Sequence, residues 1–154
     1  MSKRALCMGI NNYPGTHMDL SGCVNDANDW AAELAARGFA VSKLLDSQAT
    51  KAAMVNAIQS VIGGAVSGDV VVITYSGHGT YVPDTNGDEV DGLDEALCPY
   101  DLQTGGEALV DDEINTLFSA RKAGVRLLLI SDSCHSGTVT RAAAPDPDAD
   151  DAPR

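Results

Sequence analysis

The chain has 154 residues, and its hydrophobic content of 44% is enough for one compact domain with its own core, which excludes a second full domain. It carries 10 Lys and Arg against 22 Asp and Glu. The formal net charge of -12 argues against nucleic acid and anionic membranes as partners and favours basic peptides or metal ions. Neither a signal peptide nor an apolar run of about 18 residues is found, which predicts a cytoplasmic protein.

Short apolar runs alternate along the chain with apolar residues at helical spacing. In chain order they predict a strand at 4–10, a helix at 22–37, a strand at 39–45, a helix at 50–62, a strand at 69–75, a helix at 112–120 and a strand at 125–131. This order predicts an α/β fold with an open, mostly parallel sheet and helices on both faces. In such sheets ligands bind at the carboxyl ends of the strands, so chemistry is expected there.

The composition changes near residue 140. Residues 1–140 form the expected globular domain, whereas residues 141–154 are rich in Ala, Pro and Asp and poor in large apolar side chains. Such a segment cannot bury enough apolar surface to offset its ordering, so it is expected to be a disordered linker or processing tail.

The chain has four scattered cysteines, without the paired CxxC spacing of zinc sites or the density of a disulfide scaffold. They are Cys7, Cys23, Cys98 and Cys134. We expect free thiols, three of them ordinary buried or half-buried residues and one of them a nucleophile.

Two polar clusters stand at the ends of two buried strands. They are SGHG at 76–79 and DSCHSG at 132–137. Because alternate residues of an extended chain share a face, Ser76 is expected beside His78, and Asp132 beside Cys134. The two polar pairs are then expected to line one cleft.

A thiol and an imidazole in that cleft predict nucleophilic catalysis. A neutral thiol is a poor nucleophile, and His78 is placed to take the proton of Cys134. Gly79 leaves the N–H beside His78 unobstructed, and with the N–H of Cys134 it is expected to bind an oxyanion. The expected reaction is acyl transfer, most simply peptide hydrolysis. His135 is the competing base, although adjacent residues tend to point apart, and His17 is expected to be a loop residue.

These motifs resemble those of the metacaspases, the caspase-like cysteine proteases of non-animal lineages. YSGHG and DSCHSG, with Cys134 56 residues after His78, carry the likeness. It covers about residues 4–140 and includes CMGINNYPG, GCVNDA and DGLDEALCPYD. The resemblance implies a caspase-like fold without the small-subunit strands, in which residues 1–140 are the large-subunit catalytic domain.

The resemblance also implies cleavage after Arg or Lys through an acidic pocket. The family's pocket residues match Cys23, Asp26, Ser76 and Asp132. The spacing agrees independently, since Cys23 and Asp26 are three apart at a helix start and share a face. Two carboxylates can bind a guanidinium bidentately.

Many metacaspases need calcium, and the family's site matches Asp94, Asp111 and Asp112, whose oxygens suit that ion. Arg141 stands where the family often has a fourth acid, so the calcium site implied here is incomplete. The stretch 84–95 also has the acidic spacing of an EF-hand loop, but Glu89 occupies the sixth position, where the turn demands Gly.

The resemblance implies that a small-subunit region of the same protein is a partner of this chain. The chain ends 20 residues after Cys134, before that region. Without it, the strand at 125–131 is expected to present an exposed apolar edge.

The hypothesis is a metacaspase-like cysteine endopeptidase acting on basic peptides. Two alternatives stay open: a caspase-like scaffold without chemistry and a calcium-binding sensor built on the acidic insertion.

Overall fold

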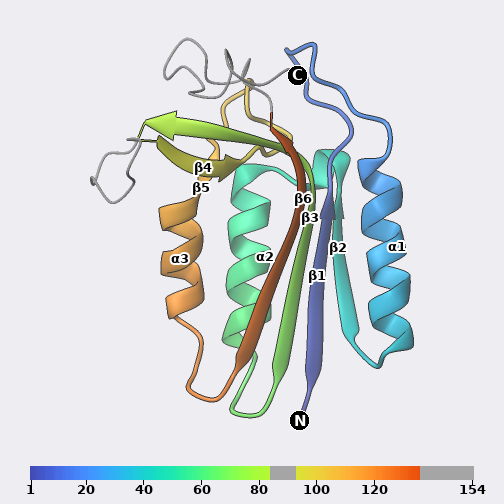
Figure 1. The fold of residues 1–154 in the computed structure, drawn as a ribbon, viewed down its shortest axis with the longest axis vertical. Helices are drawn as coiled ribbons and strands as arrows, with labels where there is room; N and C mark the ends of the chain where they lie inside the picture. The colour runs from blue at the N-terminus through green and yellow to red at the C-terminus, as the bar shows by residue number, and fades with distance from the viewer. Residues whose placement is uncertain (84–92, 136–154) are drawn as a thin grey trace, which may run out of the picture.

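Figure 1 shows the computed structural model of the chain, which describes residues 1–83 and 93–135. A sheet forms the middle layer, with α1 on one face and α2 and α3 on the other (Figure 1). The elements are β1 (Lys3–Gly9), α1 (Cys23–Ala36), β2 (Ala40–Leu45), a 3-10 turn (Asp46–Gln48), α2 (Lys51–Gly63), β3 (Val70–Pro83), β4 (Leu93–Leu97), β5 (Leu109–Val110), α3 (Asp111–Ser119) and β6 (Arg126–His135).

The six strands follow the order β2-β1-β3-β4-β5, with β6 pairing β3 outside this path. The pairs of β1 with β2, β1 with β3 and β3 with β6 are parallel. Both β1 and β6 pair with the segment of β3 from Val70 to Ser76, so they lie on opposite edges of it. The expected α/β fold, with a largely parallel sheet covered on both faces, is confirmed.

The sheet also contains a part that the sequence did not predict. β4 pairs antiparallel with β3, and β5 pairs antiparallel with β4. β4 uses the edge of β3 beyond the point where β1 has ended, because its register begins at Gly79 and that of β1 stops at Ser76.

β3 and β6 are both longer than predicted. β3 was expected to end at residue 75 and runs to Pro83, while β6 was expected to end at 131 and runs to His135. The extra residues stay extended because they have partners: β4 pairs with Gly79–Pro83, and β6 pairs with β3 up to Gly79. The two polar clusters therefore begin inside paired strands and not in loops that follow them.

Alternate residues of the strands fill two cores, one on each face of the sheet. Leu6, Met8 and Ile73 pack in the cluster that contains Met54 and Ile58 of α2. The opposite cluster is built largely of small side chains, including Ala5 and Cys7 of β1 and Ala27 and Ala31 of α1. Small residues bring α1 close to the sheet.

The closest approach of α1 to the sheet is at Gly9. A Cβ on Gly9 would lie 2.5 Å from the carbonyl oxygen of Cys23 and 2.7 Å from the Cβ of Ala27. Only glycine leaves that space. The first turn of α1 is thereby held against the carboxyl end of β1, where the candidate pocket residues begin.

Among residues 1–83 and 93–135, no helix combines the length and the apolar composition needed to cross a bilayer.

Candidate active site

The register of β3 and β6 brings the two polar clusters together. His78 is the partner of Cys134, and Ser76 is the partner of Asp132. In parallel strands, paired positions share a face of the sheet. Val72 of β3 and Ile130 of β6 belong to the cluster under α1, so the positions at even spacing from them, including these four, lie on the α1 face. The side chains of Cys134 and His135 lie outside the described part of the chain.

His78 is 7% exposed, and its ring has two defined neighbours. Nε2 hydrogen-bonds to the main-chain carbonyl of Met18, and the centroid of the ring lies 5.0 Å from that of Tyr13, with the planes tilted by 59°. A carbonyl can only accept, so Nε2 carries the proton and, in the neutral imidazole, Nδ1 is the nitrogen that accepts one. In this tautomer Nδ1 is the ring nitrogen without a proton.

The loop that carries Tyr13 and Met18 is anchored at the carboxyl ends of β1 and β2. The carboxylate of Asp46 accepts hydrogen bonds from the main-chain N–H groups of Asn11 and Asn12, at 2.8 and 3.0 Å. The side-chain oxygen of Asn11 in turn accepts from the N–H of Cys23, at 2.8 Å, and supplies the cap that Gly22 does not provide for α1. The loop and the first turn of α1 are thus fixed to the same strand ends.

Asp26 and Asp132, two of the predicted pocket residues, line one pocket. It has a volume of about 210 Å³ and is completed by Asp29, Trp30 and Glu33. Asp26 stands in the first turn of α1 and Asp132 at the exposed surface of β6, so the spacing argument from the helix and the argument from the strand lead to the same place. All four ionisable side chains of this pocket are acidic.

The other two predicted pocket residues, Cys23 and Ser76, are buried. Gly9, Ser76 and Asp132 form one row across β1, β3 and β6, and Cys23 opens α1 above Gly9. Ser76 is 1% exposed, and its Oγ has no hydrogen-bond partner among the described residues. An unsatisfied buried hydroxyl costs free energy that a polar ligand can recover.

Gly79 lies in a more crowded position than the sequence suggested. It is the partner of Leu97 in β4 and of His135 in β6, so there is a strand on each side of it. Its N–H faces a neighbouring strand whichever way it points. An oxyanion can reach it only if the last pairs of β3 and β6 separate.

The described residues do not make a calcium site. Asp111 lines a cavity of about 90 Å³ that also contacts Glu95, whereas Asp112 lines a different pocket beside Glu113. No group of three metal-ligating side chains occurs in residues 1–83 and 93–135. Calcium takes six to eight oxygens, so this donor set does not fit the ion by itself. The side chain of Asp94, Arg141 and most of the stretch 84–95 lie outside the described part.

The remaining predicted residues have clear positions. Cys7, Cys23 and Cys98 are free, buried thiols, as the sequence analysis expected of three of the four. Burial raises the pKa of Cys7, and it raises the pKa of Cys98 to about 12, so neither is a ready nucleophile. His17 is exposed on the loop before α1.

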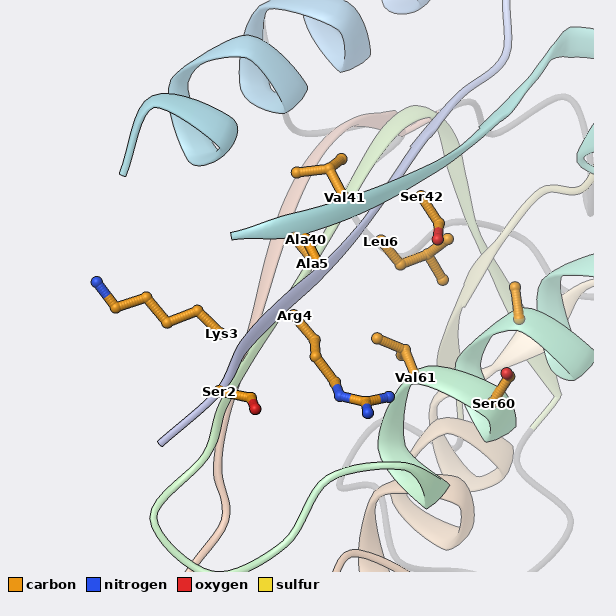
Figure 2. A pocket seen from close by; sticks show the side chains of 11 residues that line it. Ser2, Lys3, Arg4, Ala5, Leu6, Ala40, Val41, Ser42, Ser60 and Val61 are labelled. Atoms are coloured by element: carbon orange, nitrogen blue, oxygen red, sulfur yellow. The ribbon is translucent and has the colours of Figure 1, made fainter. Parts of the chain in front are cut away.

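A larger pocket lies away from these residues. Its volume is about 530 Å³, and it is lined by Ser2, by the first residues of β1, by β2 and by α2 (Figure 2). Figure 2 shows the side chain of Arg4 reaching toward Val61, while Lys3 points the other way. Because it lies at the amino end of β1, it belongs to the opposite end of the sheet from His78.

Sequence reasoning missed Tyr13, Tyr75 and Met18, which surround His78. Tyr75 stands inside the YSGHG motif and Tyr13 inside CMGINNYPG, so both motifs marked the right segments. The role of Met18 is carried by its main chain, which leaves no signal in the residue type.

Comparison with known proteins gives a consistent picture. Residues 3–143 match the family described as metacaspase, peptidase C14 domain. The chain is 40% identical over 146 residues to Metacaspase-1 of Cryptococcus neoformans var. neoformans serotype D (strain JEC21 / ATCC MYA-565), covering 88% of this chain and 32% of that protein. It is 42% identical over 147 residues to Metacaspase-7 of Arabidopsis thaliana, covering 89% and 35%.

A solved structure agrees in fold. The crystal structure of protein GSU0716 from Geobacter sulfurreducens superposes with a TM-score of 0.77 at 43% identity, covering 92% of this chain and 54% of that one. The chain thus spans about a third of the length of the curated relatives described above.

Proposed function

The chain belongs to the metacaspase family of cysteine peptidases, and from this premise we propose that it carries the Cys-His dyad of an endopeptidase that cleaves after Arg or Lys. The observation that supports the dyad is the register of β3 and β6, which pairs the position of His78 with that of Cys134 on the α1 face. Cys134 is the proposed nucleophile and His78 the proposed base.

The protonation of His78 defines the steps. Nε2 keeps its proton on the carbonyl of Met18, and Nδ1 takes the thiol proton of Cys134. The thiolate attacks the carbonyl carbon of the peptide bond, forming a C–S bond and an oxyanion. The C–N bond then breaks, and the leaving amine takes the proton from Nδ1. Water then gives a proton to the same nitrogen and attacks the thioester carbon. The C–S bond breaks, the carboxylic acid leaves, and the thiolate takes the proton from Nδ1, which restores the thiol.

The N–H groups of Gly79 and Cys134 are the proposed donors to the oxyanion. Because Gly79 has strands on both sides, this role requires β6 to part from β3 at its last positions when substrate binds. The small-subunit region that the family resemblance implies is the proposed source of the contacts that hold this open arrangement.

Specificity for basic residues rests on the pocket of Asp26 and Asp132. Two carboxylates on separate elements can bind the two edges of a guanidinium. Ser76, the strand partner of Asp132, adds a buried Oγ that has no hydrogen-bond partner among the described residues. A neighbouring carboxylate disfavours thiolate formation, so a bound cation also favours the reactive form of Cys134.

The proposal is tested on the complete protein with a fluorogenic peptide ending in Arg. Cys134→Ala and His78→Ala should each abolish turnover, whereas Cys7→Ala, a change at a buried thiol in β1, should leave most of it. Unchanged turnover in Cys134→Ala rejects the dyad. No turnover by the wild-type protein would instead support the scaffold alternative.

A second comparison tests the pocket. Replacing the peptide's Arg by citrulline, which has similar shape and no charge, should lower kcat/KM by about 100-fold or more. Asp26→Asn should reduce the ratio of kcat/KM between the Arg peptide and the citrulline peptide. Glu107→Gln, which neutralises an exposed loop residue, should leave that ratio unchanged. Equal turnover of both peptides by the wild-type protein would exclude the acidic pocket as the specificity site.

A further inference from the structure

We propose that Tyr13 and Tyr75 are positioning residues for His78, joined to its main chain in a closed ring of hydrogen bonds. The inference rests on the proposed role of His78 as the base. It concerns how the chain holds the imidazole, which no catalytic motif by itself specifies.

The ring is built from three contacts, all among buried groups. The N–H of His78 donates to the hydroxyl of Tyr13 at 2.8 Å, and the hydroxyl of Tyr75 donates to the carbonyl of His78 at 2.6 Å. The two hydroxyls lie 3.3 Å apart. Tyr13 is 1% exposed and Tyr75 0%, so bulk water does not replace these partners.

The direction of every bond in the ring is fixed by its ends. An N–H can only donate and a carbonyl can only accept, and each hydroxyl has one proton. The hydroxyl of Tyr75 donates its one proton to two carbonyl oxygens, that of His78 and, at 2.9 Å, that of Cys98. The proton of Tyr13 is therefore left for the oxygen of Tyr75. The circuit runs one way from the N–H of His78 to its own carbonyl.

The sheet leaves a place for this ring. β1 pairs with β3 only up to Ser76, whose carbonyl accepts from the N–H of Ile10, so His78 lies beyond the end of that ladder. The hydroxyl of Tyr13 occupies the position that a further β1 residue would fill. Gly77 completes the arrangement, since a Cβ there would lie 2.6 Å from both hydroxyl oxygens.

The same loop holds the imidazole itself. Tyr13 contacts the His78 ring, and Met18, five residues later in the loop, accepts the Nε2 proton. The main chain and the ring of His78 are thus both held by the loop that carries Tyr13 and Met18. A shift of Tyr13 should therefore change the distance from Nε2 of His78 to the Met18 carbonyl. Loss of the Tyr13 hydroxyl should therefore allow the other tautomer, with the proton on Nδ1, to become populated.

The test reads the tautomer directly. In the chain labelled with 15N-histidine, the three histidines give separate ring-nitrogen signals, and wild-type His78 should show a protonated Nε2 and an unprotonated Nδ1. In Tyr13→Phe and Tyr75→Phe the two signals should move toward each other as both tautomers become populated. Tyr100→Phe, at a half-buried tyrosine of another loop, is the matched control and should match the wild type.

Two outcomes overturn the proposal: a wild-type His78 with Nδ1 protonated, or folded Tyr13→Phe and Tyr75→Phe variants whose His78 signals equal those of the wild type. Near-ultraviolet circular dichroism establishes folding, and if one variant does not fold the other decides. In the complete protein, Tyr13→Phe should lower kcat by roughly 10- to 100-fold with KM little changed. The ring-nitrogen signals can be measured without turnover, so they test the role of the two tyrosines independently of the proposed peptidase activity.

Discussion

The two strands that carry the candidate dyad differ in how completely this chain surrounds them. β3 has partners on both edges, and Ile73 is fully buried. Within the described residues β6 pairs with β3 alone, and Leu128 is 54% exposed on it. Within the described residues, the proposed base therefore stands on a strand paired along both edges and the proposed nucleophile on a strand paired along one.

The position of His78 depends on contacts inside residues 1–135, through Tyr13, Tyr75 and Met18. The side chains of Cys134 and His135 lie outside the described part of the chain, so the contrast between β3 and β6 is drawn from residues up to Ser133.

The largest expected effect comes from cutting the same amount of apolar volume from each strand. Ile73→Ala should lower the free energy of unfolding by about 2–5 kcal/mol, because it leaves a cavity in a covered core. Leu128→Ala should change it by less than about 0.5 kcal/mol, because much of that side chain is already in water. Urea unfolding measures both. Equal losses would show that β6 is as well covered as β3.

A smaller effect is expected from filling the space inside the tyrosine ring. Gly77→Ala places a methyl against both hydroxyls and should cost about 1–3 kcal/mol of unfolding free energy. Gly63→Ala is the matched control, since it adds a methyl at the end of α2 with no atom within 4 Å and should be neutral or slightly stabilising. A Gly77→Ala variant as stable as the control would show that the hydroxyls of the two tyrosines move aside at little cost in free energy.

The sequence predicted β3 and β6 because their apolar runs are long and need both faces covered. It did not predict β4, whose LDEAL carries two acids, or β5, which has only two residues. Both are strands because β3 continues past the end of β1 and offers a free edge. That continuation depends on partners distant in sequence, which no local pattern encodes.

As with the fold, only part of the candidate site could be predicted from the sequence. Residue types and motif spacing marked His78 and Cys134, and alternation placed each beside its polar neighbour. The surroundings of His78 were not predictable, because its bonds to Tyr13 and Met18 span 65 and 60 residues. Local sequence marks the proposed reacting groups, whereas the loop that orients His78 is placed beside it by the tertiary structure.

The thiols of Cys98 and Cys134 are expected to differ in their reactivity. At pH 8, burial should lower the thiolate fraction of Cys98 by about a thousandfold, since its pKa is raised from the ordinary 9.0 to about 12. Iodoacetamide should then modify Cys134 first, and Cys98 only after unfolding. Peptide mapping by mass spectrometry at successive times measures the order. Modification of Cys98 in the folded chain as fast as Cys134 would contradict it.

The smallest effect is expected at Asp69, which directly precedes β3 and bonds to residues at the starts of β1 and β6. Its carboxylate accepts from the N–H groups of Val66 and Ser2, at 2.9 and 2.7 Å, and its carbonyl accepts from the N–H of Arg126. Those N–H groups, Val66 first, hold the pKa of Asp69 below its ordinary 3.8. Its contribution to stability is therefore present above that value and lost as the pH falls through the lowered pKa.

Asp69→Asn has one acceptor oxygen where the wild type has two, and it cannot titrate. The variant should be less stable than the wild type at pH 7, and the gap between them should close as the pH falls below about 3.8. Thermal unfolding across pH 2–7 measures the gap. The carboxylate bonds to Ser2, just before β1, whereas the contact with Arg126 of β6 uses the main-chain carbonyl of Asp69, which the variant keeps. Faster hydrogen exchange should therefore appear at the start of β1 and near Val66, and an equal increase at the start of β6 would contradict this assignment.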